Sequence, residues 1–444
     1  MIMTSQTYEV QSADKLAHIP GESGLPLLGQ TLNFVYRPEQ MPRDLYRRYG
    51  PLSRGHVYFE PVVHMIGPDA NQRVLTDNTG LFSAQQGWAP ILEHLFPGGL
   101  MLQDGEQHRR HRRIMQVAFK KDALAADLET MRPLVEQTLA GWPESMNFYP
   151  AIKRATLDMA AAVFFGLPLG PQADRMNRAF SEVVAASMAI LRLPIPGTLH
   201  HRGQRSRRFL EHFFAELIPE RRARPGNDLF SRLCTATDDD GSRFSHEEIV
   251  NHAIFTMMAA HDTTTSALTT LTYLLAKHPD WQARLRAEAL AVGPAAGYES
   301  LHELADAGLA FREALRLYPP LPMMRRRSTR AFEFAGHEIP AGTPVNLYNH
   351  FSHHMEAYWA APERFDPERF ARNEHRRHPF QYIPFGAGAH TCIGLHFAEM
   401  QVKTVLHSLL QKREIRVAPG YEMPYQLVPI SRPRDGLPVM LPAR

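Results

Sequence analysis

The most informative stretch of the chain is Pro384-Phe385-Gly386-Ala387-Gly388-Ala389-His390-Thr391-Cys392-Ile393-Gly394, which places one of only two cysteines in a glycine-rich turn. An apolar helical run from Ile393 to Met400 follows directly. Glycines let a backbone turn tightly, and a helix N-terminus offers unpaired N–H groups and a favourable dipole to an anion. A thiolate is stabilised by such donors and is a strong metal ligand. The turn is therefore suited to present Cys392 to a metal, with a buried structural cysteine as the alternative.

The overall composition points to one large domain. The 444 residues carry a net charge of +3 and contain neither repeats nor a Gly/Ser-rich linker. We expect an irregular N-terminal segment over residues 1–30 and a single domain over residues 31–444. Nothing interleaves basic and aromatic residues in a nucleic-acid-binding pattern.

Two cysteines, Cys234 and Cys392, cannot form a disulfide framework in a chain of this length, so a reducing compartment is expected. The first ten residues are polar, and no apolar run reaches the length of a membrane span. The sequence thus predicts a cytoplasmic protein without a transmembrane segment.

Long helical patterns dominate the chain. Strand-like runs are short and lie mainly near the beginning, between residues 332 and 346, and at the end. The predicted helices cover residues 39–49, 102–119, 124–139, 151–166, 176–193, 205–220, 247–277 and 393–412, and early strands cover 52–59 and 62–66. This pattern predicts a mainly α (α+β) fold in which long helices accompany small β-sheets.

The longest apolar helix is interrupted at its centre by Ala259-Ala260-His261-Asp262-Thr263-Thr264. The two small residues allow a flat group to approach the backbone closely. A threonine hydroxyl can bond the carbonyl four residues earlier and bend a helix, and an acid beside an alcohol can relay protons. Satisfied core hydroxyls are the alternative interpretation.

Together these two stretches resemble the cytochrome P-450 superfamily, through its Phe-Gly-x-Gly-x-His-x-Cys-x-Gly loop and its Ala-Gly-x-Asp/Glu-Thr-Thr helix, with Ala260 in place of the common Gly. The resemblance implies the cytochrome P-450 fold, in which helices and small sheets enclose heme b (iron protoporphyrin IX). It implies Cys392 as the iron ligand, with Phe385, Gly386, Ala259 and Ala260 beside the porphyrin. Asp262 and Thr263 would direct protons and bound oxygen.

A second set of residues resembles the superfamily's structural triad. Glu313 and Arg316 lie three residues apart on one face of a helical segment, and Arg369 stands in Pro367-Glu368-Arg369-Phe370. A buried pair of this kind needs further partners. The tetrapeptide also occurs at residues 362–365, so Arg364 competes with Arg369 for the third place.

Haem propionates need cationic partners. By resemblance these are His108 and Arg112, four residues apart on one helical face, together with Arg326 and His390. A solvated charged helix explains the first two equally well. Which arginine of the run 325–327 faces the haem stays open.

The resemblance implies a soluble bacterial-type haem-thiolate monooxygenase. Such an enzyme inserts one atom of O2 into a C–H bond of a small lipophilic substrate. No flavin or iron–sulfur signature is present, so electrons are expected from a ferredoxin or flavodoxin and its NAD(P)H-dependent reductase. Arg372, Arg376, Arg377 and Lys403 are candidates for docking that partner. A peroxide-driven peroxygenase and a non-catalytic haem sensor are the other function classes.

The substrate pocket can be placed only by family position. It should include residues from the loop 85–101, from the region 188–193 and from the two flanks of the haem. These residues are Trp88, Leu92, Phe96, Met188, Leu191, Met257, His261, Met323, Met324 and Arg325. Their apolar character favours an elongated lipophile, with fatty acid hydroxylation preferred and Arg325 or Arg192 as a carboxylate anchor. A terpenoid or polyketide substrate is the alternative, and the same side chains could be plain core.

Overall fold

The computed structural model describes residues 13–25, 28–187, 189, 192, 195–238 and 240–444. Its α-helices are α1 Thr31–Tyr36, α2 Gln40–Tyr49, α3 Pro68–Leu75, α4 Ala84–Leu92, α5 Gly105–Gln116, α6 Lys121–Ala140, α7 Phe148–Phe165, α8 Pro171–Ser187, α9 Leu199–Ala223, α10 Leu229–Thr235, α11 His246–Lys277, α12 Pro279–Val292, α13 Ala305–Leu317, α14 Asn349–Ser352, α15 Glu368–Ala371 and α16 Leu395–Lys412. The mainly helical prediction is confirmed.

The strands form one sheet of five strands and three two-stranded ribbons. The large sheet has the order β1 (Leu52–Val57), β2 (Glu60–Met65), β8 (Pro344–Leu347), β5 (Met324–Ser328) and β3 (Phe82–Ser83). Only the β2–β8 pair is parallel. The ribbons pair β6 (Phe332–Phe334) with β7 (His337–Ile339), β4 (Ser145–Asn147) with β11 (Pro438–Met440), and β9 (Tyr425–Gln426) with β10 (Arg432–Pro433).

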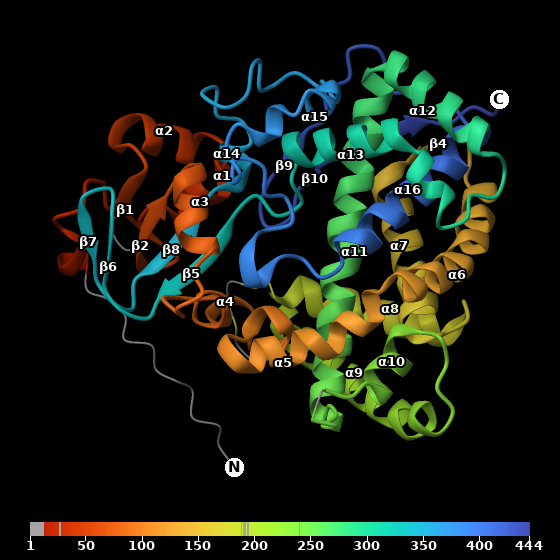
Figure 1. Cartoon of the computed structure of the whole chain (residues 1–444), viewed down its shortest axis with the longest axis horizontal. Helices are drawn as coiled ribbons and strands as arrows, with labels where there is room; N and C mark the ends of the chain where they lie inside the picture. Colours follow the sequence, from red (N-terminus) through yellow and green to blue (C-terminus); the bar gives the residue numbers. More distant parts are fainter. Residues whose placement is uncertain (1–12, 26–27, 188, 190–191, 193–194, 239) are drawn as a thin grey trace.

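The sheet and the long helices occupy opposite sides of the molecule. In Figure 1 the five-stranded sheet lies on the left, α11 runs through the helical part on the right, and the blue segment leading into α16 crosses between them. The largest buried cluster joins residues of α6 to α13 and α16, and a second joins β2, β5, β8 and α3. Phe385 and Ile393 pack against the first cluster, and Ala387 packs against the second. The cysteine loop therefore sits where the two clusters meet.

Helix α11 is the central element because both its sequence and its cap favour a long helix. Ser245 accepts a hydrogen bond from the N–H of Glu248, whose carboxylate accepts one from the N–H of Ser245, so the helix starts with a capping box. Its 32 residues correspond to about 48 Å at 1.5 Å per residue. Most of its side chains are buried, so it passes through the core.

The segment expected as a loop over residues 85–101 begins instead with helix α4. Ser83 caps this helix by accepting a hydrogen bond from the N–H of Gln86 at 2.9 Å. Gly87 lets the helix lie directly on β5, because a Cβ atom there would stand 2.7 Å from Cα of Arg326. The loop was expected from family position alone; Gly87 permits close packing on β5, and Pro90 lies inside the helix.

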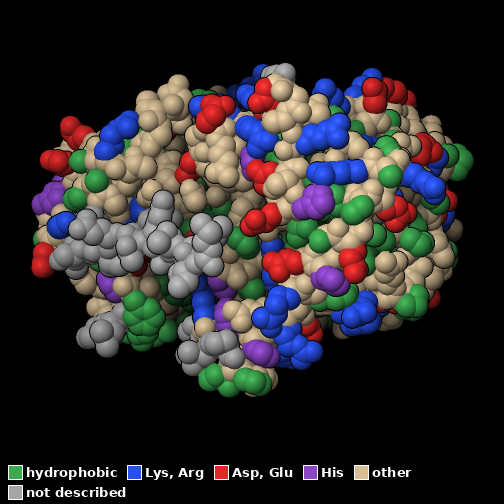
Figure 2. Space-filling model, turned by 90° about the horizontal axis from the view of Figure 1, so that it is seen from below, with side chains coloured by type: hydrophobic (Ala, Val, Ile, Leu, Met, Phe, Trp, Pro, Cys, Tyr) green, Lys and Arg blue, Asp and Glu red, His purple; other side chains and the backbone are tan. Residues whose placement is uncertain are grey.

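Helix α8 ends at Ser187, short of the predicted 193, and residues 188, 190–191 and 193–194 lie outside the described part. Among the described residues we find no helix with the length and apolar character needed to cross a bilayer. On the face seen in Figure 2, Lys and Arg side chains are interspersed with Asp and Glu side chains.

Candidate active site around Cys392

The loop around Cys392 is a tight turn held by its own backbone. The N–H of Cys392 donates to the carbonyl of Phe385 at 2.9 Å, and the N–H of Gly386 donates to the carbonyl of Ile383 at 3.0 Å. Gly386 and Gly388 have φ values of 70° and 66°, a region in which L side chains are strained. At Gly388 a Cβ atom would also stand 1.8 Å from the carbonyl oxygen of Leu75. Only glycine fits there.

The Cys392 side chain is accessible to solvent although protein surrounds it deeply. Burial raises the pKa of the thiol, while the N–H of Gly394 and the charge of Arg112 act in the opposite direction. Gly394 is the N-cap of α16, so the thiol lies at the positive end of that helix. The arrangement favours a thiolate once a cationic metal is its ligand partner.

Helix α11 is buried along most of its length but has a narrow strip of accessible residues near its centre. Ala259 is exposed, and Met258, Ala260 and Thr263 are half-buried, although the helix on both sides of them is buried. The Thr263 hydroxyl donates to the carbonyl of Ala259 at 2.7 Å. This i−4 bond is the kind that bends helices and opens the backbone toward a neighbouring group. The strip supplies a flat surface with one alcohol.

Asp262 is buried in α11 next to Thr263, and Lys153 and His261 hold its carboxylate. Its Oδ1 accepts a hydrogen bond from Nζ of Lys153 at 2.9 Å and lies 3.1 Å from Nε2 of His261. Burial would raise the pKa of this carboxyl, but the two partners together bring its pKa well below the ordinary value. Lys153, on α7, keeps about a quarter of its side chain exposed. Asp262 therefore links the interior to the solvent through Lys153.

A cluster of cationic and imidazole groups lies next to the loop and organises around Asp104. The Asp104 carboxylate accepts hydrogen bonds from the Ser83 hydroxyl and from the N–H groups of Ala84 and Gln85, which fixes the start of α4. His390 stands 3.5 Å from the same carboxylate. Its ring lies 4.0 Å from the ring of His108, centroid to centroid.

Among the described residues, Arg326 has no hydrogen-bonded carboxylate and His108 has a ring nitrogen without a hydrogen-bond partner. The Arg326 guanidinium is buried, and its one described hydrogen bond goes to the carbonyl of Arg325. Burial lowers the pKa of Arg326 to about 10, with Asp104 acting weakly against it. Nε2 of His108 is buried and has no partner among the described residues. Arg112, whose pKa burial also lowers, lies close enough to influence the Cys392 thiol.

These features fit the haem that the resemblance implies. An accessible thiol lies deep in the protein, α11 offers a strip of small residues, and the cluster next to the thiol contains a buried guanidinium without a hydrogen-bonded carboxylate and a buried imidazole nitrogen without a partner among the described residues. Carboxylates of a propionate type are the groups that would satisfy them. The set Cys392, Arg326, His108, Arg112 and His390 is thus assembled on one side of the molecule.

The neighbouring arginines of β5 are already paired. Arg325 and Arg327 both contact the carboxylate of Glu60 on β2. Side chains alternate between the faces of a strand, so Arg326 points the other way. Arg326 is therefore the arginine of the run 325–327 that turns toward the cysteine loop. It also corrects the expectation that Arg325 lines the substrate pocket or anchors a carboxylate.

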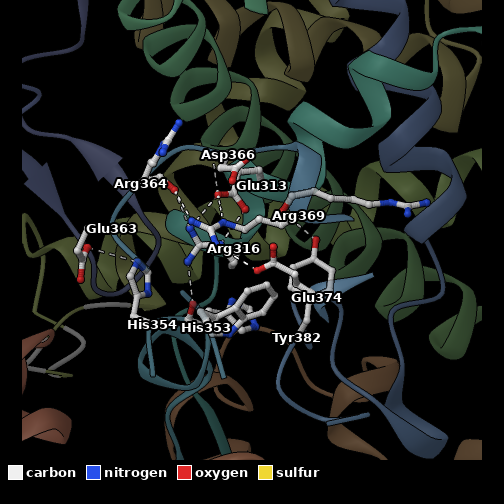
Figure 3. A network of polar contacts seen from close by, with 12 residues as sticks. Glu313, Arg316, His353, His354, Glu363, Arg364, Asp366, Arg369, Glu374 and Tyr382 are labelled. Atoms are coloured by element: carbon white, nitrogen blue, oxygen red, sulfur yellow. Dashed lines mark hydrogen bonds and ion pairs between the residues drawn. The ribbon is translucent and has the colours of Figure 1, made fainter. Parts of the chain in front are cut away.

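Glu313, Arg316 and Arg369 meet in one buried network (Figure 3). Nε and Nη2 of Arg316 donate to the two oxygens of Glu313 at 2.8 and 2.9 Å, and Nε of Arg369 donates to Oε1 at 3.1 Å. Arg364 contributes only its carbonyl, which accepts from both arginines. The competition between Arg364 and Arg369 is therefore decided for Arg369.

One histidine connects this network to the cysteine loop. The carbonyl of His353 accepts a hydrogen bond from Nη1 of Arg316 at 2.9 Å. Its ring Nε2 lies 3.0 Å from the N–H of Ile383, which is the residue before Pro384. Since a backbone N–H can only donate, Nε2 accepts. The triad is thus joined to the loop through His353.

The residues predicted for the pocket separate into different environments. Trp88 and Leu92 lie on α4 against the large cluster, and Met324 packs beside the loop, with its sulfur 3.7 Å from where a Cβ of Gly386 would be. Phe96 and Met257 are fully enclosed core side chains, and His261 is turned to Asp262.

The remaining predicted positions are Met323 and Arg192, which the structure describes, and Met188 and Leu191. Met323 packs in a third cluster with Tyr348, away from the loop. Met188 and Leu191 lie outside the described residues. Arg192 is exposed and donates to the carbonyl of Pro90 at 2.5 Å.

One of the four residues predicted to dock a redox partner does not lie at the surface. Lys403 is buried, donates to the carbonyl of Leu301 at 3.0 Å and pairs with Glu399. It therefore cannot contact a partner's surface. Arg372 and Arg377 pair with Glu374 at the surface.

Sequence reasoning missed Asp104, Lys153 and His353. Asp104 carries a usable signal, because an aspartate before Gly105 at a helix start is typical of a cap. Lys153 and His353 carry none, since their partners are 109 and 30 residues away in the chain.

Comparison with known proteins agrees with this geometry. A family model described as "Cytochrome P450" matches residues 19–436. The chain is 40% identical over 440 residues to "Putative cytochrome P450 136" of Mycobacterium tuberculosis, covering 97% of this chain and 89% of that protein. It is 29% identical to "Abscisic acid 8'-hydroxylase 3" of Oryza sativa subsp. indica, over 94% of this chain and 85% of that protein.

The solved structure "Retinoic acid bound cyanobacterial CYP120A1" is similar throughout. It superposes with a TM-score of 0.87 at 29% identity, and the match covers 96% of this chain and 99% of that one.

Proposed function

Because the chain belongs to the cytochrome P450 family, and is therefore a haem-dependent monooxygenase, we propose that it hydroxylates a lipophilic carboxylic acid of isoprenoid type. One oxygen atom of O2 enters a C–H bond of the substrate. The other leaves as water, which consumes two electrons and two protons. Haem supplies the reductive activation of O2 in this chemistry.

The single observation that supports the site assignment is the accessible Cys392 thiol, which lies deep in the protein at the positive end of α16. Cys392 would hold the iron of heme b. Arg326, His108, Arg112 and His390 would bind the propionates, because among the described residues Arg326 has no hydrogen-bonded carboxylate and His108 has a ring nitrogen without a hydrogen-bond partner. Phe385, Gly386, Ala259 and Ala260 would border the ring.

Asp262 and Thr263 would supply protons to the reacting oxygen. Thr263 lies on the exposed strip of α11, and the Asp262 carboxylate next to it is joined to Lys153, about a quarter of whose side chain is exposed. An acid–alcohol pair connected to solvent suits this role.

The substrate class rests on the relatives together with the apolar surroundings. Retinoic acid is bound in one similar structure, and abscisic acid is the substrate named for one relative. Both are isoprenoid carboxylic acids. Trp88, Leu92 and Met324 offer apolar contact to such a molecule. Straight-chain fatty acids share the carboxylate but lack the branched, unsaturated body, and they are the second candidate.

Electrons would come from a ferredoxin or flavodoxin with an NAD(P)H-dependent reductase, since the sequence contains no flavin or iron–sulfur signature.

The absorption spectrum of the reduced carbon monoxide complex tests the site. A strongly red-shifted Soret band is expected, and it should vanish in Cys392→Ala. A folded, haem-loaded protein without that band would contradict the proposal. For the substrate, isoprenoid acids and fatty acids of equal carbon number are compared by the shift that each causes in the Soret band and by the product formed with a reconstituted ferredoxin system. Turnover confined to the fatty acids would overturn the isoprenoid assignment.

A further inference from the structure

Two imidazole rings and a guanidinium meet beyond the end of α4. His94, two residues after that helix, lies with its ring centroid 5.4 Å from the ring centroid of His200, on the first turn of α9. Arg192 reaches the same region from the other side, because its Nη1 donates to the carbonyl of Pro90. Three separate segments therefore place their positive or polar groups together.

The two imidazole rings carry nitrogens without hydrogen-bond partners among the described residues. Both ring nitrogens of His94 and Nδ1 of His200 are buried and unpaired among the described residues, and His200 is only 4% exposed. A neutral imidazole has one donor and one acceptor, and leaving such a group buried without a partner is unfavourable. A polar ligand at this place would remove that cost.

The charge at this place favours an anion. Within the part of the chain that the structure describes, no ion pair joins His94, His200 or Arg192 to a carboxylate, whereas Arg325 and Arg327 on β5 share Glu60. The N-terminus of α9, a helix of 25 residues, adds its positive end next to His200. Burial first, and then Arg192 and His200, lower the pKa of His94 to about 4, so the positive charge here comes from Arg192 and the helix N-terminus.

The location suits the far end of a long substrate. Helix α4 starts at Ser83, which is bonded to Asp104 in the cluster beside Cys392, and it ends just before His94. Its nine residues span about 14 Å. Trp88 and Leu92 lie along this helix and are apolar. A molecule lying along α4 would therefore have one end near the cysteine loop and the other near His94.

We propose that His94, His200 and Arg192 form the binding site for the carboxylate of an elongated lipophilic acid. This assignment rests on the proposed monooxygenase function and specifies how its substrate is recognised. The carboxylate accepts hydrogen bonds from the imidazoles and the guanidinium, and the apolar body extends along α4 toward Ala259 and Thr263.

The test compares an acid with its ester on the haem-loaded enzyme. All-trans-retinoic acid and methyl retinoate have the same body and differ only in the charged group. Their dissociation constants are measured by equilibrium dialysis and by the Soret shift, for the unaltered protein and for Arg192→Met, His94→Gln and His94→Leu. Arg205→Met is the matched control, because Arg205 is an exposed arginine one turn farther along α9.

We expect the acid to bind at least about 10-fold more tightly than the ester, since hydrogen bonds to a charged group are stronger than those to a neutral group. Arg192→Met and His94→Leu should weaken binding of the acid about 10-fold and change binding of the ester less than about twofold. His94→Gln should weaken binding of the acid by a smaller factor, and the Arg205→Met control should leave binding of the acid unchanged.

Equal affinity for the acid and the ester would overturn this carboxylate site. An equal weakening of acid and ester binding in the variants would also overturn it. So would the absence of binding by either ligand. The proposed function is judged separately, by the carbon monoxide spectrum and by oxygenated product, so each can fail without the other.

Discussion

Nε2 of His353 accepts a hydrogen bond from the N–H of Ile383 at 3.0 Å, which joins the buried Glu313–Arg316–Arg369 network to the first residues of the cysteine loop. The acceptor role requires an unprotonated Nε2. Burial first, and then His354 and Arg316, keep the pKa of His353 well below its ordinary value. His353 is therefore neutral across the physiological range.

Replacing His353 by Leu removes the acceptor while keeping the site apolar. We expect amide hydrogen exchange at Ile383 to accelerate about 10-fold or more, because the N–H loses its only described partner. The fraction of the carbon monoxide complex with the thiolate-type band should fall as well. His353→Gln can place an amide oxygen where Nε2 was and should restore both. Unchanged exchange at Ile383 in His353→Leu would argue against the connection.

Breaking the triad should destabilise the whole protein. Arg369→Met leaves the fully buried Glu313 carboxylate with one guanidinium partner instead of two. Removing one member of a buried ion pair costs about 3–5 kcal/mol. Urea unfolding measures this loss of stability. Arg377→Met is the control: its ion pair with Glu374 is half-exposed, so the substitution should lower the free energy of unfolding by less than about 1 kcal/mol. Equal effects of the two variants would contradict this ranking.

The contact between Lys153 and Asp262 should control proton supply. Asp262→Asn removes the acid and is expected to slow product formation by about 100-fold or more, the usual scale for a lost proton-transfer group. Lys153→Met keeps the acid but removes a partner that lowers its pKa, so that pKa should rise.

The check is the turnover rate and its solvent deuterium isotope effect as functions of pH. Arg154→Met, next to Lys153 and paired with Asp174 at the surface, serves as the control. A Lys153→Met enzyme with an unaltered rate and isotope effect at every pH would exclude this path.

Stability should fall steeply in mild acid because several histidines are buried in the neutral form. Burial lowers the pKa of His64 and His252 to about 3 and that of His354 to about 4. Below pH 6.5 these residues bind protons in the unfolded chain and not in the native one. Each then reduces the free energy of unfolding by about 1.4 kcal/mol per pH unit until its native pKa is reached.

Urea midpoints at pH 7.5, 6.5 and 5.5 measure this effect. The His64→Gln variant should show a smaller decrease than the unaltered protein, because glutamine does not titrate and can still bond Tyr348 or Gln30. A midpoint that stays constant down to pH 5.5 would refute the expectation.

The sequence predicted the elements whose signals are local. The glycines at 386 and 388, the small residues at 259 and 260, and the three-residue spacing of Glu313 and Arg316 each describe contacts within a turn or a helix. Contacts between segments that are far apart in the chain could not be predicted from the sequence. The pairing of Glu60 with Arg325 spans 265 residues, and that of Lys153 with Asp262 spans 109. For the same reason Arg325 was wrongly expected in the pocket, because nothing near it in the chain indicates the carboxylate that neutralises it.

The three consecutive arginines of β5 also protect the sheet against misalignment. Glu60 on one face balances Arg325 and Arg327, while Arg326 alone reaches the other face. A slip of one residue would exchange the faces. Two guanidinium groups would then enter the cluster beside the cysteine loop, and Glu60 would lose one of its two cations. The alternation of charge thus selects a single register for the strand during folding, before any ligand is bound.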